Sequence, residues 1–268
     1  MTSTTAPPGA TRPRGKLLRG KLLRQLPRLA LLLALAAVLL LAVGPLGWRA
    51  GWWHFRVGFT MLMPWAAYCG LAAIAVALIA LAFGARSNSR GNIAIGVLAF
   101  IIGAGIAYVP WHYSQMRGAV PLINDITTDW DNPPQFDAIL PLREAAKANP
   151  VAYGGAKISD VQRKAYPDIA PLTLALAPAE AFARALDTAR QRGWTIVASD
   201  PAQGRIEASQ RSRWFGFTDD VVIRVAAAGA GSRVDLRSVS RIGRGDYGVN
   251  AARVRGYLAA LREASQSR

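Results

Sequence analysis

Polar and charged side chains are concentrated between Thr218 and Asn250, where packing alone does not require them. Carboxylates of this kind can act as general acids and bases, and arginines can hold a carboxylate or a phosphate. Serine hydroxyls can line a cavity or satisfy backbone groups. The candidate binding residues are Asp219, Asp220, Arg237, Ser238, Ser240, Arg241, Asp246 and Asn250.

The serines and arginines of this stretch alternate along one expected strand. Ser238 and Ser240 project to one face, and Arg237 and Arg241 project to the other. The hydroxyl pair either lines the end of a cavity or satisfies backbone groups at the rim of the domain. The arginines, together with Arg244, either clamp an anion or pair with the neighbouring aspartates inside the domain.

The aspartates also allow two interpretations. Asp219 and Asp220, with Asp246 and Asn250, carry the oxygen ligands that a hard cation requires. However, the sequence contains no regular ligand loop, and Asp246 and Asn250 lie where the start of a helix favours acids and caps. We therefore expect no metal site, and we expect the first two aspartates to be solvated or paired with arginine.

Several kinds of active site are excluded by composition. No cysteine follows Cys69 and no histidine follows His112, so the downstream half cannot form a Ser-His triad, a Cys-His pair or a His/Cys zinc site. His54 and His112 lack accompanying carboxylates and are interpreted as interfacial polar residues. The run from Gly243 to Gly248 matches a dinucleotide-binding pattern. However, the helix that follows it is the last predicted element, so no parallel βαβ unit can follow. A glycine-dependent turn and no cofactor are therefore predicted. Carboxylate acid–base chemistry remains possible.

The positive charge of the chain is concentrated in its first half. The formal net charge is +16 over 268 residues, and the first acidic residue is Asp125. Twelve Lys and Arg residues precede Asp125, whereas the remaining 20 bases accompany 16 acids. No stripe of basic residues with interleaved aromatics follows, so the charge indicates membrane topology and no nucleic acid partner.

Three apolar runs before residue 111 are long enough to cross a bilayer as helices. The positive-inside rule places the basic N-terminal tail and the loop with Arg86 and Arg90 in the cytoplasm. The aromatic clusters Trp48–Phe55 and Tyr108–Tyr113 then lie at the opposite face of the membrane. The sequence therefore predicts a multi-pass protein of the bacterial inner (cytoplasmic) membrane, with a cytoplasmic N-terminus and a periplasmic C-terminal domain.

After residue 170, apolar residues recur at strand or helix spacing. Short turns between strands predict an antiparallel sheet, with both helices on one of its faces. The predicted fold class is α+β, an N-terminal three-helix transmembrane region followed by a two-layer domain with about five strands and two helices. The expected order is a strand at 172–177, a helix at 178–192, strands at 194–199, 205–209, 221–225 and 233–241, and a final amphipathic helix.

Changes in composition divide the chain into four parts. Pro, Asx and Thr residues between the membrane region and the regular pattern are typical of an ordered extended segment. The predicted parts are a basic disordered cytoplasmic tail at 1–28, a membrane region at 29–116 with transmembrane helices at about 29–47, 61–83 and 92–110, an extended connecting segment at 117–170, and the α+β domain at 171–268.

The downstream half also carries several short motifs in order, namely Ile126–Asp129, Pro133–Phe136, Phe217–Val221, Arg237–Gly243, Asp246 and Gly248–Asn250. Over roughly residues 120 to 264 these resemble the domain-of-unknown-function family 1499. The membrane segments are similar to those of bacterial members that carry this domain behind a small helical anchor. The resemblance leads us to expect histidine where Asn124 stands and serine at Gly245, which argues against a role for a family histidine here. The family has no established activity.

We therefore expect a membrane protein whose periplasmic domain acts as a non-enzymatic binding or interaction module of the cell envelope. Its expected partners are the lipid bilayer and an envelope ligand or protein. The alternative is a carboxylate-dependent hydrolase or transferase that acts on an envelope component through the paired aspartates. A third interpretation makes the polar residues purely architectural, as a network that holds the hairpin against the last helix.

Overall fold

The structure is a computed structural model that describes residues 14–87 and 89–266. The chain folds as two compact units, which divide between Ser114 and Gln115. Residues 1–13 of the expected N-terminal tail lie outside the described residues. The rest of that tail is helical, because α1 begins at Arg14.

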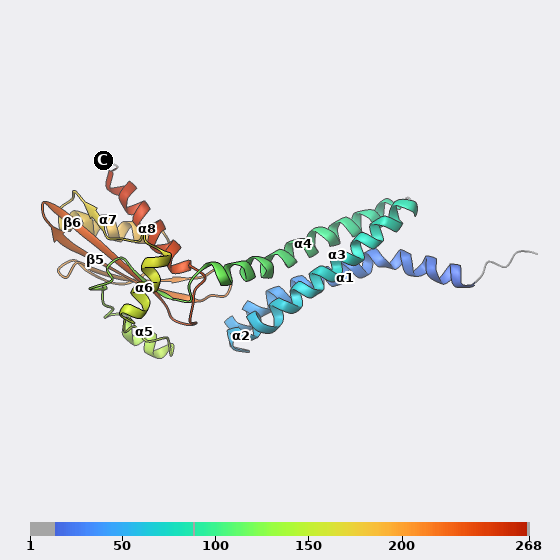
Figure 1. Ribbon diagram of the computed structural model, residues 1–268, viewed down its shortest axis with the longest axis horizontal. Coiled ribbons are helices and arrows are strands. Elements are labelled where there is room, and N and C mark those ends of the chain that lie inside the picture. Colours follow the sequence, from blue (N-terminus) through green and yellow to red (C-terminus); the bar gives the residue numbers. More distant parts are fainter. Residues whose placement is uncertain (1–13, 88, 267–268) are drawn as a thin grey trace, which may run out of the picture. The chain divides into compact units, whose positions relative to one another are not determined.

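The first unit consists of helices long and apolar enough to cross a membrane. The candidate spans are Leu23–Arg49, Phe55–Gly84 and Arg90–Met116, with mean hydropathies of 2.8, 2.4 and 2.3. The chain therefore has the features of a membrane protein with three spans. Its helices are α1 (Arg14–Arg49), α2 (Phe55–Val57), the π-helix η1 (Gly58–Leu62), α3 (Met63–Ser87) and α4 (Arg90–Ala119), coloured blue to green in Figure 1.

Both aromatic clusters of the membrane unit lie at the same end of its helices. The rings of Phe59 and Tyr113 meet edge to face with centroids 6.5 Å apart. His54 packs on Phe55, and its Nδ1 accepts a hydrogen bond from the backbone N–H of Arg56. This arrangement suits amphipathic rings at a lipid–water boundary.

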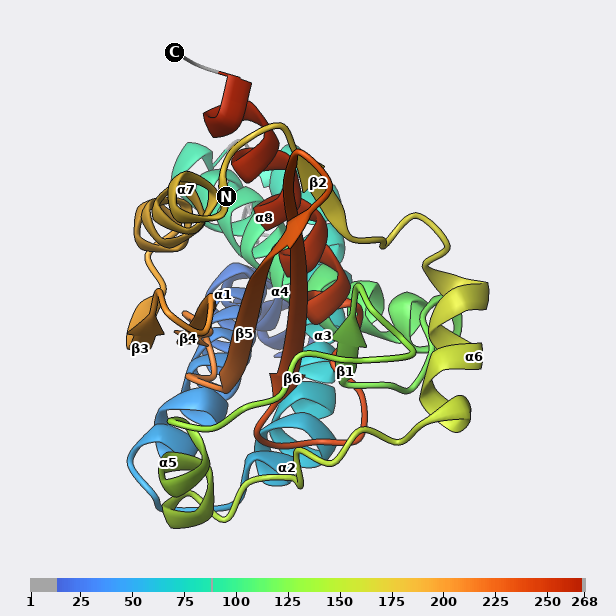
Figure 2. The same cartoon turned by 90° about the vertical axis from the view of Figure 1, so that its left-hand side faces the viewer.

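The second unit is an α+β domain built on a six-stranded antiparallel sheet with the order β1-β6-β5-β4-β3, in which β2 also pairs with β6. The strand and helix order expected after residue 170 is confirmed (Figure 2). Its elements are β1 (Asp125–Thr127), α5 (Leu140–Ala145), α6 (Ala156–Ala165), β2 (Leu172–Leu174), α7 (Pro178–Gln191), β3 (Thr195–Asp200), β4 (Arg205–Arg211), β5 (Thr218–Ala228), β6 (Gly231–Ser240) and α8 (Val249–Gln266).

The range 117–170, expected as an extended connecting segment, contributes β1, α5 and α6 to the domain. β1 joins the sheet beside β6, where Ile126 stands opposite Ser238. Its three residues are all buried, so they show no alternation that would indicate a strand. The sheet therefore gains a strand from a segment whose sequence is irregular.

The two faces of the sheet are covered differently. Helices α7 and α8 pack on one face, which we call the helix face, and enclose the main core with Val221, Ile223 and Leu236. The opposite face, which we call the charged face, carries a small apolar cluster of Phe136, Ile139, Val222 and Val239. Because side chains alternate along β5 and β6, every second side chain lies on the charged face, in a polar layer that residues 125–153 cover.

Candidate functional site

The sheet divides the eight predicted site residues between its two faces. Cross-strand partners share a face, and Asp219 stands opposite Ser240 while Asp220 stands opposite Val239. The predicted residues therefore do not form one surface. The helix face holds Asp219, Ser238, Ser240, Asp246 and Asn250, and the charged face holds Asp220, Arg237 and Arg241.

The polar group on the helix face is organised by Arg253 of α8, a buried residue that the sequence interpretation missed. Its Nη2 donates to Asp219 Oδ2 at 2.5 Å, and its Nη1 donates to Ser238 Oγ at 3.0 Å and to Asn250 Oδ1. Asn250, which is fully buried, donates in turn to Ser240 Oγ at 2.9 Å. These contacts fix the start of α8 against the ends of β5 and β6.

Asp246 caps the start of α8. Its carboxylate accepts hydrogen bonds from the backbone N–H groups of Gly248 at 2.9 Å and Asn250 at 2.6 Å. The turn before the helix depends on glycine, because Gly243 and Gly248 have φ values of +87° and +80°. Burial raises the pKa of Asp246 above its usual value and the charge of Asp219 adds to this, although both backbone hydrogen bonds oppose it.

The raised pKa of Asp246 predicts a pH dependence of stability. The folded state binds this proton more tightly than the unfolded state, so the associated stability is complete below the ordinary carboxyl pKa and is lost as the pH rises through the folded-state value. Asp246→Asn keeps an acceptor for the cap but does not titrate. We expect its Tm relative to the native protein to rise over the pH range that begins near the ordinary carboxyl pKa of about 4 and extends upward. Thermal melts across that range check this, and a constant difference in Tm would contradict it.

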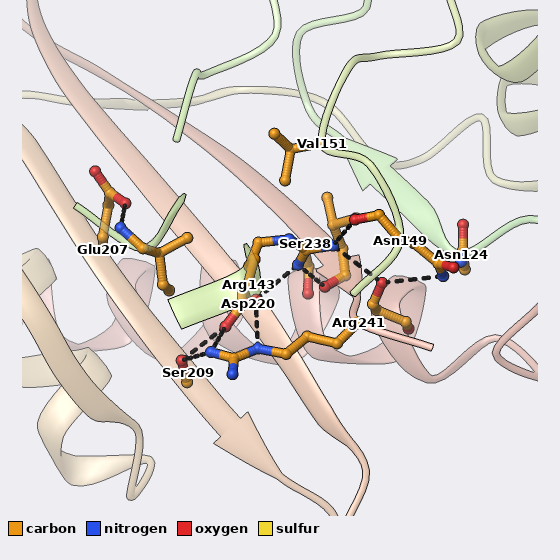
Figure 3. A network of polar contacts seen from close by, with 12 residues as sticks. Asn124, Arg143, Asn149, Val151, Glu207, Ser209, Asp220, Ser238 and Arg241 are labelled. Carbon is orange, nitrogen blue, oxygen red and sulfur yellow. Dashed lines mark hydrogen bonds and ion pairs between the residues drawn. The ribbon is translucent and has the colours of Figure 1, made fainter. Parts of the chain in front are cut away.

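Asp220 is the centre of the group on the charged face (Figure 3). This fully buried carboxylate accepts two hydrogen bonds from Arg241, from Nε and Nη2 at 2.8 Å each. Arg143 Nη1 donates to it at 2.6 Å and Ser209 Oγ at 2.7 Å. Arg143 also donates to the backbone oxygen of Asn149, so that α5 and the loop after it are joined to the sheet.

Arg237 is held in a second buried group next to this one. Its guanidinium makes a two-point contact with Asp125, at 2.9 and 2.8 Å, and donates to the backbone oxygen of Val151 at 2.6 Å. The rings of Phe136 and Tyr153 lie within 5.5 and 5.4 Å of the guanidinium carbon. Burial, followed by the charge of Asp125, raises the pKa of Tyr153 to about 12, so its hydroxyl stays protonated at neutral pH.

Glu207 holds the chain that leads into α5. This fully buried side chain accepts hydrogen bonds from three consecutive backbone N–H groups, those of Asp137, Ala138 and Ile139, at 3.0 to 3.1 Å. Arg205 Nε lies 3.2 Å from the same carboxylate. A buried charge is tolerated where donors of this kind compensate it.

These contacts define an ordered polar network over the whole range from β1 to α8. A family model described as "Protein of unknown function (DUF1499)" matches residues 125–261, from the start of β1 into α8. The chain belongs to this family. No curated protein matches it. The DUF1499 domain therefore begins at β1, which places the segment with α5 and α6 inside the domain.

The DUF1499 domain has a depression beside α5, with a volume of about 340 Å³. Arg143 lines it, and Lys147 and Glu144 contribute charged side chains. Arg143 Nε is buried and has no hydrogen-bond partner among the described residues. Burial lowers the pKa of Arg143, an effect that Asp220 opposes. The remaining lining residues are Leu140, Ala148, Asn149, Pro150 and Val151.

The two adjacent aspartates, Asp219 and Asp220, lie on different faces of the sheet and have different arginine partners. Asp219 and Asp220 are adjacent in sequence but face opposite sides of the sheet, so they cannot act on one substrate as an acid–base pair. Each is engaged by arginine, Asp219 by Arg253 and Asp220 by Arg143 and Arg241. The described residues contain no group of three or more His, Cys, Asp or Glu side chains suited to a metal ion.

Proposed function

We propose that the protein is a non-enzymatic module of the cell envelope, in which the DUF1499 domain binds a small ligand close to the bacterial inner membrane. In this proposal the N-terminus is cytoplasmic and the domain is periplasmic, in keeping with the basic residues of the tail and of the loop at Arg86 and Arg90. The eight polar residues expected to bind serve the fold, since they contact one another or their neighbours inside the domain. Binding therefore uses the depression beside α5.

The observation that carries the proposal concerns Arg143, a residue that lines this depression and whose buried Nε has no hydrogen-bond partner among the described residues. An unsatisfied buried donor is costly, more so on a charged group. A carboxylate or phosphate group in the depression would place a negative charge beside the guanidinium of Arg143, and Lys147, which also lines the depression, would add a second positive charge. Leu140 and Pro150 provide apolar walls for the rest of such a ligand.

Lys147 offers a variant that preserves the fold. Its φ of +48° is a left-handed conformation that asparagine adopts more readily than lysine, so Lys147→Asn removes the charge without adding backbone strain. We expect native mass spectrometry of the detergent-purified full-length protein to show a small anion that is already bound. If none is bound, we expect the protein to bind added phosphate or acetate. The Lys147→Asn change is expected to weaken that binding by about tenfold, as for one charge-assisted contact.

The control is Lys164→Asn, which removes an exposed lysine from α6, outside the depression. Binding that both variants weaken equally would reflect overall charge and not this site. A protein that carries no small anion and takes up neither phosphate nor acetate would contradict the proposal, and it would leave a protein partner or a purely architectural role as the alternatives.

A further inference from the structure

Three separate parts of the chain meet at one end of the sheet. The β4–β5 loop leaves the sheet after Arg211 and returns to it at Thr218, and these two residues are cross-strand partners. The loop from β6 to α8 starts beside it, because the backbone N–H of Arg241 donates to the backbone oxygen of Thr218 at 3.0 Å. Asn124, directly before β1, accepts from the backbone N–H of Ser240 at 3.0 Å. This end of the sheet is therefore the one at which the chain arrives from α4.

The two loops at this end are basic and aromatic. The sequence from Gln210 to Phe217 reads Gln-Arg-Ser-Arg-Trp-Phe-Gly-Phe and contains no acid. Arg213 and Arg244, one in each loop, are exposed. Asp246 is the only acid between Arg241 and Gly248, and its carboxylate is occupied by the two backbone N–H groups at the start of α8.

Ordered apolar side chains accompany these charges. In the β4–β5 loop, Trp214 meets Phe215 edge to face and Phe215 stacks on Phe217, with ring centroids 5.1 Å apart in both pairs. Leu122 and Val249 are 69% and 48% exposed at the same end of the domain. Clusters of arginine with aromatic and aliphatic side chains are typical of protein surfaces that lie at a lipid–water interface.

The covalent chain restricts this end of the domain to the neighbourhood of the bilayer. The third candidate span ends at Met116 and β1 begins at Asp125, nine residues later. Even a fully extended chain of that length reaches only about 30 Å. The length of this connection therefore allows the arginines at this end of the domain to approach the headgroups of the bilayer.

We propose that this end of the domain, formed by Leu122, Arg211–Phe217, Arg244 and Val249, binds the anionic phospholipid headgroups of the bilayer that α4 crosses. The arginines contact the phosphates, and the exposed Leu122 and Val249 with the partly exposed Trp214 enter the headgroup region, while the buried Phe215 supports the loop from inside the domain. Each arginine near an anionic surface strengthens attachment by about fivefold. None of these residues lines the depression beside α5, so this surface is independent of the proposed ligand site.

The test is amide hydrogen exchange of the full-length protein in lipid nanodiscs. We expect residues 211–217 to exchange at least about fivefold more slowly in discs that contain phosphatidylglycerol than in discs of phosphatidylcholine alone. The turn Pro201–Gly204, at the other end of β4, serves as an internal reference and should not change. The double variant Arg213→Glu/Arg244→Glu should lose the difference, as should raising the salt well above about 0.15 M.

Arg262→Glu is the matched control, since this exposed residue lies about 20 Å along α8 from Val249. It should retain the lipid-dependent protection. Equal exchange of residues 211–217 in both kinds of disc would overturn the proposal. So would protection that persists in the double variant, because the headgroup charge would then not be what these loops bind.

Discussion

Replacing Asp220 with asparagine is expected to lower the free energy of unfolding of the DUF1499 domain by about 3–5 kcal/mol, the usual cost of removing one partner from a buried ion pair. The asparagine occupies nearly the same volume, so packing is preserved. It leaves Arg143 and Arg241 without the carboxylate that now accepts from both. Burial lowers the pKa of Arg143 and Asp220 opposes this, so the loss of the carboxylate leaves the burial of the guanidinium uncompensated.

The measurement is amide exchange of β5 and β6 in the detergent-solubilised full-length protein at increasing denaturant, because their slowest amides report global unfolding of the domain. Asp137→Asn is the matched control. The carboxylate of Asp137 also pairs with an arginine, Arg205. Because the Asp137 side chain is 66% exposed, we expect this variant to lose less than about 1 kcal/mol in the free energy of unfolding. If both variants were equally stable and only Asp220→Asn lost a binding or catalytic activity, the carboxylate would be functional and the architectural role would be wrong.

The regular parts of the domain could be predicted because their sequences alternate. Val221, Ile223 and Val225 mark β5 as a strand with one apolar face, and all three lie in the main core. The same alternation requires Asp219 and Asp220 to face opposite sides, so a single site containing both contradicts the pattern that defined the strand. The sequence shows which positions are polar, but how these residues group in space depends on what covers each face of the sheet.

The residues that complete the two networks give weaker signals. Arg253 lies among the inward-facing positions of α8, three residues after Asn250 and one before Val254, so a charged residue at a core position could have been noticed. Arg143 and Glu207 give no such indication. Their burial depends on α5 packing over the sheet, which is a long-range contact in a segment without apolar periodicity.

The charges on the charged face explain why the segment of residues 125–143 folds onto the sheet. Among the described ion pairs there, strands β4 to β6 and Arg241 directly after β6 contribute five arginines and three acids, an excess of two positive charges. Residues 125–143 contribute three aspartates and one arginine, an excess of two negative charges. The paired charges therefore balance only when this segment covers the sheet, and Phe136 and Ile139 add apolar contact with Val222 and Val239.

Removing Arg237 is expected to release this covering segment. Arg237→Met deletes the two-point contact with Asp125 and the hydrogen bond to Val151, and it leaves the carboxylate of Asp125 buried without its partner. We expect a loss of about 3–5 kcal/mol in the free energy of unfolding. Amide exchange should accelerate most between residues 129 and 153, since Arg237 also contacts the rings of Phe136 and Tyr153.

A double variant separates the cost of an unpaired charge from the value of the pair itself. Asp125→Leu/Arg237→Met removes both charges, and apolar side chains of similar volume often replace a buried ion pair at little cost. We therefore expect the double variant to recover most of the stability that Arg237→Met loses, while the orphaned backbone oxygen of Val151 prevents complete recovery. A double variant no more stable than the single one would mean that the arginine acts mainly through Val151 and the two rings, and that the charge balance between sheet and segment does not hold residues 129–153 in place.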